Sequence, residues 1–225
     1  IALFGALPFL FSKLDMSIMD AIFESTSGIT TTGSTVITNL ENTSYGILLW
    51  RSLLQWLGGI GIIVMAIAIL PMLSIGGMQL FKSESYETKE KVIPRAAIFA
   101  SGISIVYGML TALWAFMLWF VGMPIFDSIA HAMTTIATGG FSTKSNSLAA
   151  FDSFYVELII TFGMIVGSLP FVHFLSILKN GWKNLIQDDQ VKLFLMILLV
   201  LVFLVALNLN FNGINFFEAI RLSLF

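Results

Sequence analysis

The chain has 225 residues, of which 57% are hydrophobic and only 11% are charged, and its mean hydropathy is +0.94. Because soluble domains contain about 25% charged residues, this composition argues against a soluble protein and predicts a chain that lies in a lipid bilayer. The net charge of −2 gives no reason to propose nucleic acid as a partner. The absence of cysteine excludes disulfides, thiolate metal sites and cysteine nucleophiles.

The chain starts directly in an apolar run, IALFGALPFLF, without a charged leader or a small-residue cleavage site. We therefore expect no signal peptide. Instead, we expect the apolar run to be the end of a first membrane span whose beginning is cut off, so that the chain is part of a longer protein.

The segment 20–35, DAIFESTSGITTTGST, begins as an amphipathic stretch and then changes to small hydroxyl residues around Gly33. The amphipathic part is long enough for about three helical turns. It predicts a short helix over 20–30, followed by a loop over 31–35. The polar residues 37–45 then predict an aqueous loop.

The first full-length span is predicted over 46–70. Trp50 and Trp56 lie near its start, where tryptophan anchors a helix at the membrane interface. Three glycines follow, and close helix packing explains them better than a dinucleotide-binding turn, because no strand precedes them. These glycines are Gly58, Gly59 and Gly61.

Arg51 and Gln55 lie one helical turn apart in this span. A charge near the membrane is costly and often functional. Two interpretations of Arg51 stay open. Its side chain either extends to the outer interface, or it braces the first loop by hydrogen bonds to carbonyl groups, with Glu24 of the preceding helix as its partner.

A second copy of the loop segment follows at 127–143, DSIAHAMTTIATGGFST. It is preceded by a charged segment over 74–95, which predicts a cytoplasmic loop, and by a second long span over 96–121. The copy predicts a helix over 127–137 and a loop over 138–142. Aligned without a gap, the two copies match Asp20 to Asp127, Ile29 to Ile136, Thr31 to Thr138 and Gly33 to Gly140.

A third span is predicted over 154–178, after the polar residues 144–152. It is interrupted by small residues and a proline, namely Gly163, Gly167 and Pro170. A second cytoplasmic loop is predicted over 179–190, and a fourth span over 191–209.

The end of the chain, FEAI at 217–220, is similar to FDSI at 126–129. It predicts that a third short helix begins over 217–225. The fold class is therefore an all-α membrane protein built from repeated units of span, re-entrant helix, loop and span. Residues 1–73 form the first repeat, 96–178 the second and 191–225 the start of the third. Internal repeats in a membrane chain predict a site where the repeats meet.

The basic residues predict the orientation of the chain. The two segments interpreted as cytoplasmic hold seven of the eleven Lys and Arg residues: Lys82, Lys89, Lys91, Arg95, Lys179, Lys183 and Lys192. The positive-inside rule therefore predicts that both hydroxyl-rich loops face outside.

Hydroxyl and glycine residues at membrane depth suit a cation path. An irregular backbone there is tolerated only where protein or a water-filled cavity satisfies it. Glycine takes positive φ without a Cβ penalty, so Gly33 and Gly140 allow carbonyls to turn toward one axis. Carbonyl oxygens replace the hydration shell of a monovalent cation, and the preceding helix directs its negative end at the loop. The predicted ion-binding residues are Thr31, Thr32, Gly33, Thr138, Gly139 and Gly140.

Other interpretations of these residues fit the sequence less well. A phosphate-binding loop is excluded because no lysine follows the glycine, and an ordinary polar turn does not explain the repetition. His131 and His173 are too few for a metal site without clustered acids. A membrane enzyme would need an ionisable cluster, and Glu24, His131 and Arg51 are scattered along the sequence, so we expect no enzyme.

The pair SGITTTGST and TIATGGFST, with WRSLLQWLGGIGI after the first, resembles the Trk/Ktr/HKT superfamily of potassium transporters. The resemblance implies potassium uptake across the bacterial inner membrane through a potassium-channel-like pore. It places the filter glycines at Gly33 and Gly140, and it implies potassium ligands at Thr31, Thr32, Thr138 and Gly139. Glycine rather than serine at the first filter position favours potassium. A sodium-selective or sodium-coupled transporter of the same superfamily is the alternative.

The resemblance also implies a homodimer on a cytoplasmic nucleotide-binding regulatory ring of the TrkA/KtrA kind, and no cofactor besides the transported potassium ion. It places a gating loop and the fourth repeat beyond Phe225. Whether transport is channel-like or a symport coupled to protons or sodium stays open, as does the gating ligand.

Overall fold

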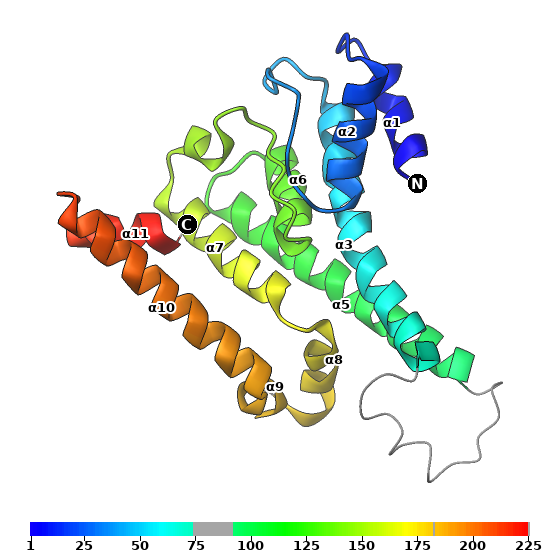
Figure 1. Ribbon diagram of the computed structural model, residues 1–225, viewed down its shortest axis with the longest axis vertical. Coiled ribbons are helices and arrows are strands. Elements are labelled where there is room, and N and C mark those ends of the chain that lie inside the picture. Colours follow the sequence, from blue (N-terminus) through cyan, green and yellow to red (C-terminus); the bar gives the residue numbers. More distant parts are fainter. Residues whose placement is uncertain (74–91, 182, 225) are drawn as a thin grey trace.

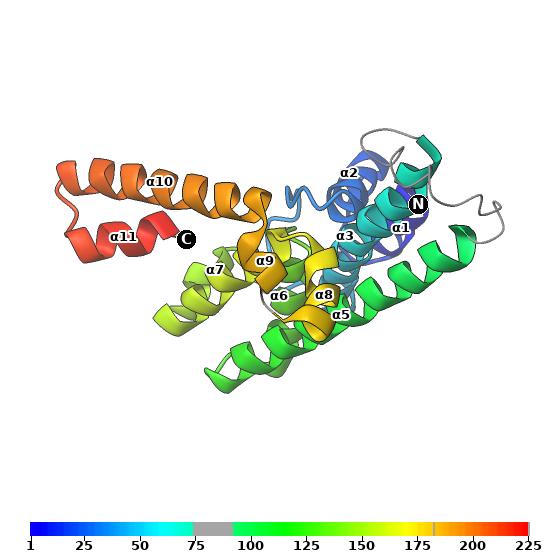
Figure 2. The same ribbon diagram turned by 90° about the horizontal axis from the view of Figure 1, so that it is seen from below.

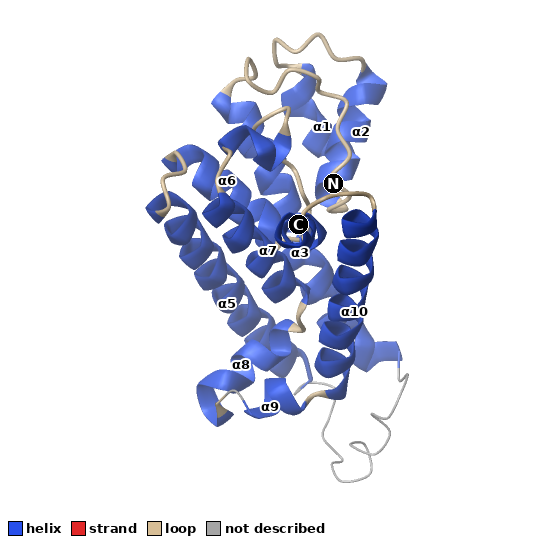
Figure 3. Cartoon of the chain, turned by 90° about the vertical axis from the view of Figure 1, so that its left-hand side faces the viewer, coloured by secondary structure: helices blue, strands red, loops and turns tan. Residues whose placement is uncertain are grey.

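The computed structural model describes residues 1–73, 92–181 and 183–224. Within these ranges every regular element is a helix, so the all-α class predicted from the sequence is confirmed for this part of the chain (Figure 3). The elements are α1 (Ala2–Leu10), α2 (Ile18–Ile29), α3 (Tyr45–Leu73), α5 (Val92–Phe120), α6 (Ile125–Ile136), η2 (Ser147–Phe151), α7 (Phe154–Ser168), α8 (Phe171–Asn180), α9 (Lys183–Gln187), α10 (Asp189–Phe211) and α11 (Phe216–Leu224).

The two short helices α2 and α6 each lie among other helices of the bundle. α2 packs against α1 and α3, whereas α6 packs against α3, α5 and α7 (Figure 1). α3 therefore contacts both short helices. The polar segments that follow α2 and α6 lie at the end of the molecule opposite to α8 and α9 (Figure 3).

The helices α10 and α11 form a hairpin that extends from the rest of the molecule (Figure 2). Most of the large apolar side chains of α10 are exposed, including Leu199, Leu201 and Phe203. An exposed apolar helix is typical of a chain that lies in lipid rather than in water. Asp188 caps this helix, because its Oδ1 accepts hydrogen bonds from the backbone N–H groups of Gln190 and Val191 at 2.9 and 3.0 Å.

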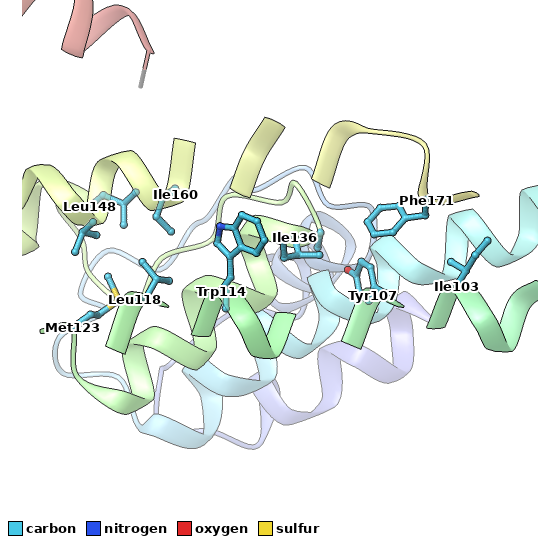
Figure 4. Packing of buried hydrophobic residues seen from close by; sticks show 12 residues of the cluster. Ile103, Tyr107, Trp114, Leu118, Met123, Ile136, Leu148, Ile160 and Phe171 are labelled. Atoms are coloured by element: carbon cyan, nitrogen blue, oxygen red, sulfur yellow. The ribbon is translucent and has the colours of Figure 1, made fainter. Parts of the chain in front are cut away.

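The main core lies where α5, α6, α7 and α8 meet (Figure 4). Two large polar aromatic side chains are buried in it, and both have hydrogen-bond partners, as buried polar groups require. The Tyr107 hydroxyl donates to the carbonyl of Trp56 at 3.0 Å, and Trp114 Nε1 donates to the carbonyl of Ile159 at 2.9 Å. The remaining labelled members of the cluster are Ile103, Leu118, Met123, Ile136, Leu148, Ile160 and Phe171.

Trp50 and Trp56, which the sequence suggested as interfacial anchors, are half-buried and join helices. Trp50 Nε1 donates to the carbonyl of Gly5 in α1 at 2.9 Å. Trp56 Nε1 donates to the hydroxyl of Thr111 in α5 at 3.0 Å. Their indole N–H groups are therefore used within the helix bundle.

The span over 154–178 is predicted with interruptions at Gly163, Gly167 and Pro170, and the structure breaks it once, before Pro170, into α7 and α8. The break falls at Leu169, which is extended (φ −79°, ψ 149°). A residue before proline is disfavoured in the helical region, and Pro170 follows. The 15 residues of α7 rise only about 23 Å, less than the ~30 Å of the hydrocarbon core.

Two helical segments of the described residues are long and apolar enough to cross a membrane, Ala100–Phe120 and Asp189–Phe211. The helix boundaries also shift from the predicted ones. α3 continues past Pro71 to Leu73, α5 begins inside the segment predicted as a cytoplasmic loop, and the segment 179–190 contains α9. Lys82, Lys89 and Lys91, on which the predicted orientation depends, lie outside the described residues.

Candidate functional site

The helix α2 ends in a Schellman motif that leads into the first hydroxyl-rich loop. The Thr31 N–H donates to the carbonyl of Gly28 at 3.0 Å, and the Thr32 N–H donates to the carbonyl of Ser27 at 2.9 Å. Thr31 occupies the left-handed position of the motif with φ of +56°. This position usually holds glycine, because a β-branched side chain is strained at positive φ.

The helix α6 ends in the same motif at matching residues. The Thr138 N–H donates to the carbonyl of Thr135 at 2.9 Å, and the Gly139 N–H donates to the carbonyl of Thr134 at 2.8 Å. Thr138 is left-handed as well, with φ of +53°. The two copies seen in the sequence therefore share one local backbone conformation.

Both loops alternate in the sign of φ. Gly33 has φ of +83° and Gly140 has φ of +79°, as the sequence analysis predicted for these two glycines. The left-handed Thr31 and Thr138 precede them by two residues and were not predicted. Left-handed residues therefore recur at every second position in both loops.

The two loops touch each other at Gly33. A Cβ atom on Gly33 would meet the backbone oxygen of Gly139, so no side chain fits there without displacing the second loop. At Gly140 no other described residue lies within 4 Å of such an atom. The two matched glycines are therefore unequal, because only Gly33 faces the neighbouring loop directly.

Glu24 of α2 holds the end of the first loop. The Thr35 hydroxyl lies 2.9 and 3.0 Å from the two carboxylate oxygens of Glu24, and the Val36 N–H donates to Oε2 at 3.0 Å. Glu24 is fully buried. A buried carboxylate requires such donors, and it also requires a compensating charge.

His131 occupies the position of Glu24 in α6, and it holds the second loop in a related way. Its Nε2 lies 3.0 Å from the Ser142 hydroxyl, and its Nδ1 lies 2.8 Å from the carbonyl of Asp127. Because a carbonyl only accepts, Nδ1 carries the proton and Nε2 accepts from Ser142. The same loop has a second tie, since the Thr143 hydroxyl donates to Asp127 Oδ1 at 2.6 Å.

Asp20 and Asp127 both lie in the first turn of their helices, where a negative charge interacts favourably with the helix dipole. Their roles differ, however. Asp20 forms a capping box with Ser17, whereas the buried Asp127 binds Thr143. The matching residue of the repeat therefore caps the helix in the first copy and holds the loop in the second.

Arg51 of α3 does not extend to the interface, because its side chain is only 2% exposed. Its Nε donates to Glu24 Oε1 at 2.7 Å, which is the partner suggested from the sequence. Its Nη1 donates to the carbonyl of Ser142 at 2.9 Å, and the guanidinium lies 4.1 Å from the centre of the Phe141 ring. Arg51 therefore braces the second loop directly, whereas the first loop was predicted.

Gln55 of α3 contacts the second loop as well, and sequence reasoning assigned it no role. Its Nε2 donates to the carbonyl of Gly139 at 2.7 Å, and its Oε1 accepts from the Phe141 N–H at 3.1 Å. Gln55 is fully buried. One feature of the sequence could have identified Gln55: its amide lies one helical turn from a charged residue in an apolar span, where polar side chains are costly.

Glycines of α3 and α7 allow close contact with the ends of the short helices. A Cβ atom on Gly58 would meet the carbonyl of Ile29, and one on Gly167 would lie 2.8 Å from the carbonyl of Ile136. Ile29 and Ile136 are matched residues of the repeat. The close packing predicted for the glycines of α3 is confirmed at Gly58, whereas Gly61 faces open space.

The polar segments beyond the two loops are joined to each other. The Ser145 hydroxyl donates to Glu41 Oε2 at 2.6 Å, and the Ser145 N–H donates to Glu41 Oε1 at 2.8 Å. These bonds, with the hydroxyl bond the stronger cause, hold the pKa of Glu41 below its usual value. The Leu40 N–H also donates to Ser145 Oγ at 3.1 Å.

Two cavities adjoin the loops, and Thr138 lines both. One has a volume of about 330 Å³ and extends along the second loop to Met164 and Ser168 of α7. The other has a volume of about 420 Å³ and brings Thr31 and Thr138 together with α8. The exposed hydroxyl-rich residues of the loops therefore border open space rather than packed protein.

Among the described residues, no group of three or more His, Asp and Glu side chains is placed to hold a metal ion. His173 lies apart from His131, with its Nε2 3.2 Å from Asp188 Oδ2. Glu24, Arg51 and His131, which are scattered in the sequence, converge in the structure. Arg51 and His131 both contact Ser142, and Glu24 pairs with Arg51. All three are engaged in holding the loops.

Comparisons with known proteins show one family. A family model described as TrkH, cation transport protein, matches residues 3–224. The Trk system potassium uptake protein TrkH of Salmonella typhimurium is 42% identical over 214 residues, which cover 93% of this chain and 44% of that protein. The Trk system potassium uptake protein TrkI of Halomonas elongata is 41% identical over 203 residues, which cover 90% of this chain and 41% of that protein.

The crystal structure of the potassium transporter TrkH from Vibrio parahaemolyticus matches with a TM-score of 0.87 and 36% sequence identity. The match covers 99% of this chain and 46% of that structure. The chain therefore spans less than half the length of the relatives that it matches.

Proposed function

Because this chain belongs to the TrkH family of cation transport proteins, we propose that it forms part of the potassium path of an uptake protein in the bacterial inner membrane. The family is one of transporters and not of enzymes. Its relatives above are named as potassium uptake proteins, which supports potassium as the transported ion.

One observation carries the proposal: two matched loops share the same alternating backbone and touch each other at Gly33 and Gly139. We assign the ion ligands to backbone and hydroxyl oxygens of these loops. Such oxygens replace the hydration shell of potassium without a full charge that would trap the ion. The proposed ligands are Thr31, Thr32, Gly33, Thr138 and Gly140. Gly139 is buried and its carbonyl is held by Gln55, so we assign it to the support of the loop.

The electrostatics of the surroundings support a cation. The C-termini of α2 and α6 both lead directly into the loops, and a helix C-terminus carries roughly half a negative elementary charge. Glu24 lies close behind the first loop, but Arg51 neutralises it at 2.7 Å. The ion would therefore meet dipoles rather than an uncompensated carboxylate, which favours passage over tight binding.

The architecture that we propose has α2 and α6 as re-entrant pore helices, 31–35 and 138–142 as filter loops facing outside, and α11 as the start of a third pore helix. The rest of the full-length protein would supply the other half of the ion path. A homodimer and a TrkA/KtrA-like cytoplasmic ring are further proposals, which rest on the family resemblance alone.

Glycine at position 33 favours potassium over the sodium alternative. The family resemblance associates serine there with sodium, and a Cβ at this position would meet the Gly139 carbonyl. A serine would therefore displace the second loop and change the spacing of the oxygens around the ion.

The experiment compares potassium and sodium flux through the full-length protein in liposomes, for the wild type and Gly33→Ser. We expect the wild type to favour potassium and the variant to admit sodium. Gly122→Ser is the matched control, because Gly122 also has positive φ (+97°), but it precedes α6 and a Cβ atom there would have no neighbour among the described residues within 4 Å. A wild type that carries neither ion, or a Gly33→Ser variant as selective as the wild type, would reject the proposed filter.

A further inference from the structure

We propose that Gln55 is a positioning residue for ion selectivity, and that it acts on the second loop from the helix that follows the first. This inference rests on the proposed function, because it assumes that the loop 138–142 contacts the ion. Gln55 touches no proposed ligand oxygen of the ion path. It acts through the backbone of Gly139 and Phe141.

The amide of Gln55 holds the loop on both sides of Gly140. It donates to the carbonyl of Gly139 at 2.7 Å and accepts from the N–H of Phe141 at 3.1 Å. Only a side chain with both a donor and an acceptor can make these two bonds at once, and an amide has both. Gly140 lies between the two fixed points with its left-handed φ of +79°.

Buried and exposed residues also alternate along this loop. Gly139 is buried, whereas Thr138 and Gly140 on either side of it are exposed. Gln55 therefore anchors the loop through its buried residue and leaves the exposed neighbours to face the ion. Because Gln55 itself is fully buried, losing these bonds would leave the loop backbone without partners in a low dielectric, which is costly.

The close approach of Gln55 also requires a glycine at position 139. A Cβ atom on Gly139 would meet the amide group of Gln55. The absence of a side chain at position 139 therefore lets the amide of Gln55 approach the backbone closely enough to form both hydrogen bonds.

This brace is not a general feature of the repeat. Gly58 of α3 and Gly167 of α7 make equivalent contacts with Ile29 and Ile136, so they align α3 with α7. In this alignment Gln55 corresponds to Met164, and Arg51 corresponds to Ile160. The matching position of α7 therefore has no amide, and at the first junction the amide brace makes the second loop depend on the first repeat.

Two substitutions in the full-length protein test the inference. Gln55→Met keeps the length of the side chain and removes both hydrogen bonds. Gln55→Glu restores both bonds only when the carboxyl is protonated, because the acid then has one O–H donor and one acceptor. The ionised form has no donor for the carbonyl of Gly139. The readout is the ratio of potassium to sodium flux in liposomes between about pH 4.5 and 8.5, a window that lies above the ordinary carboxyl pKa of about 4.3 and covers the raised values of buried carboxyls.

We expect Gln55→Met to lower the ratio about tenfold at every pH, as the loss of one or two buried hydrogen bonds implies. We expect Gln55→Glu to be close to wild type at low pH and to lose selectivity as the pH rises. Glu24, Arg51, Asp127, His131 and Lys144 are also ionisable groups near the loops, but they are present in all three proteins. The difference between variants therefore isolates position 55.

Ser52→Ala is the matched control, since Ser52 is buried on the same helix and its hydroxyl donates to the carbonyl of Leu48 in that helix. It should keep wild-type selectivity. A potassium-selective wild type with an equally selective Gln55→Met would overturn the role of Gln55 and leave the proposed function intact. Selectivity in Gln55→Glu that does not depend on pH would overturn it as well. A wild type without potassium selectivity would instead reject the proposed function.

Discussion

Arg51 and Glu24 form a buried ion pair, with 2.7 Å between Nε and Oε1, and each partner holds a different loop. Glu24 accepts hydrogen bonds at the end of the first loop, from Thr35 and Val36. Arg51 donates to the carbonyl of Ser142 in the second loop. The pair therefore couples the positions of two loops whose sequences lie far apart.

Removing one partner of this pair should destabilise the protein strongly. Glu24→Gln or Arg51→Met leaves the other charge buried without compensation, which typically costs about 3–5 kcal/mol. The double variant should lose less than the sum of the two single losses. Urea unfolding of the full-length protein in detergent micelles, analysed as a double-mutant cycle, measures the coupling, and additive losses would contradict it.

The charge-swapped variant Glu24→Arg with Arg51→Glu should not restore transport. Glu24 also accepts hydrogen bonds from Thr35 and Val36, and an arginine at this position has no acceptor. Flux measurements on the two single variants and the swapped pair check this. Full recovery in the swapped protein would show that the ion pair alone holds the loops.

Gly33 and Gly140 should differ in their tolerance of alanine, although the sequence treats them alike. Both substitutions carry the strain of positive φ, about 1–2 kcal/mol. Only at Gly33 does the added Cβ meet the carbonyl of Gly139. We expect Gly33→Ala to lower the potassium-to-sodium flux ratio at least about tenfold and Gly140→Ala to lower it less, since about 1.4 kcal/mol corresponds to a factor of ten. Equal losses would contradict the steric argument.

Thr31→Gly should stabilise the fold while it reduces selectivity. Glycine relieves the left-handed strain of about 1–2 kcal/mol but adds about 0.5–1 kcal/mol of unfolded-state entropy, so stability should rise by up to about 1.5 kcal/mol. The hydroxyl that we assign to the ion path is lost with the side chain. Thermal unfolding and flux ratios measure the two effects.

The control for this variant is Thr30→Gly, because Thr30 has an ordinary φ of −85° and carries no left-handed strain. Its replacement should lower the unfolding temperature. If Thr31→Gly destabilises the protein as much as Thr30→Gly does, then the strain at Thr31 does not store the energy that its backbone angle implies.

Asp188 should stabilise α10 through its cap more than through His173. The N–H of Val191 is the largest cause that holds the pKa of Asp188 below its usual value, and His173 contributes less. Asp188→Asn, which keeps the capping acceptor, should therefore lower the unfolding temperature less than Asp188→Ala. An equal decrease in both variants would assign the effect to the charge.

The same cap predicts a pH dependence. The pKa of Asp188 is lower in the folded protein than the value of about 3.9 in the unfolded chain. Its contribution to the stability of the fold is therefore fully present above the unfolded pKa. It is lost as the pH falls through the lower folded pKa. The difference in unfolding temperature between wild type and Asp188→Ala should therefore be constant near neutral pH and shrink in acid.

The helices were largely predictable because their signals are local. The amphipathic segment 20–30 lies within one or two residues of α2, and the repeated segment predicted α6 in the same way. Of the three interruptions predicted in the segment 154–178, only the one at Pro170 ends the helix, because the residue before a proline is restricted to extended backbone. The helix α7 continues through Gly163 and Gly167.

The candidate site was predictable only in part. The repeated threonine and glycine residues identified the loops, and glycine chemistry predicted positive φ at Gly33 and Gly140. The left-handed threonines were missed, because local propensity disfavours β-branched residues at positive φ. The cap hydrogen bonds and the packing of the loops offset this cost, and residue propensities include neither of these interactions.

The sequence by itself determined the membrane class, the helices, the repeat and the loops, because hydrophobic pattern and turn chemistry act between neighbours in the chain. Only the tertiary structure decided which loop Arg51 and Gln55 hold, since their backbone partners Ser142 and Gly139 lie 91 and 84 residues away. It also decided that Gly33 and Gly140 differ, because the contact that separates them comes from the packing of one loop against the other.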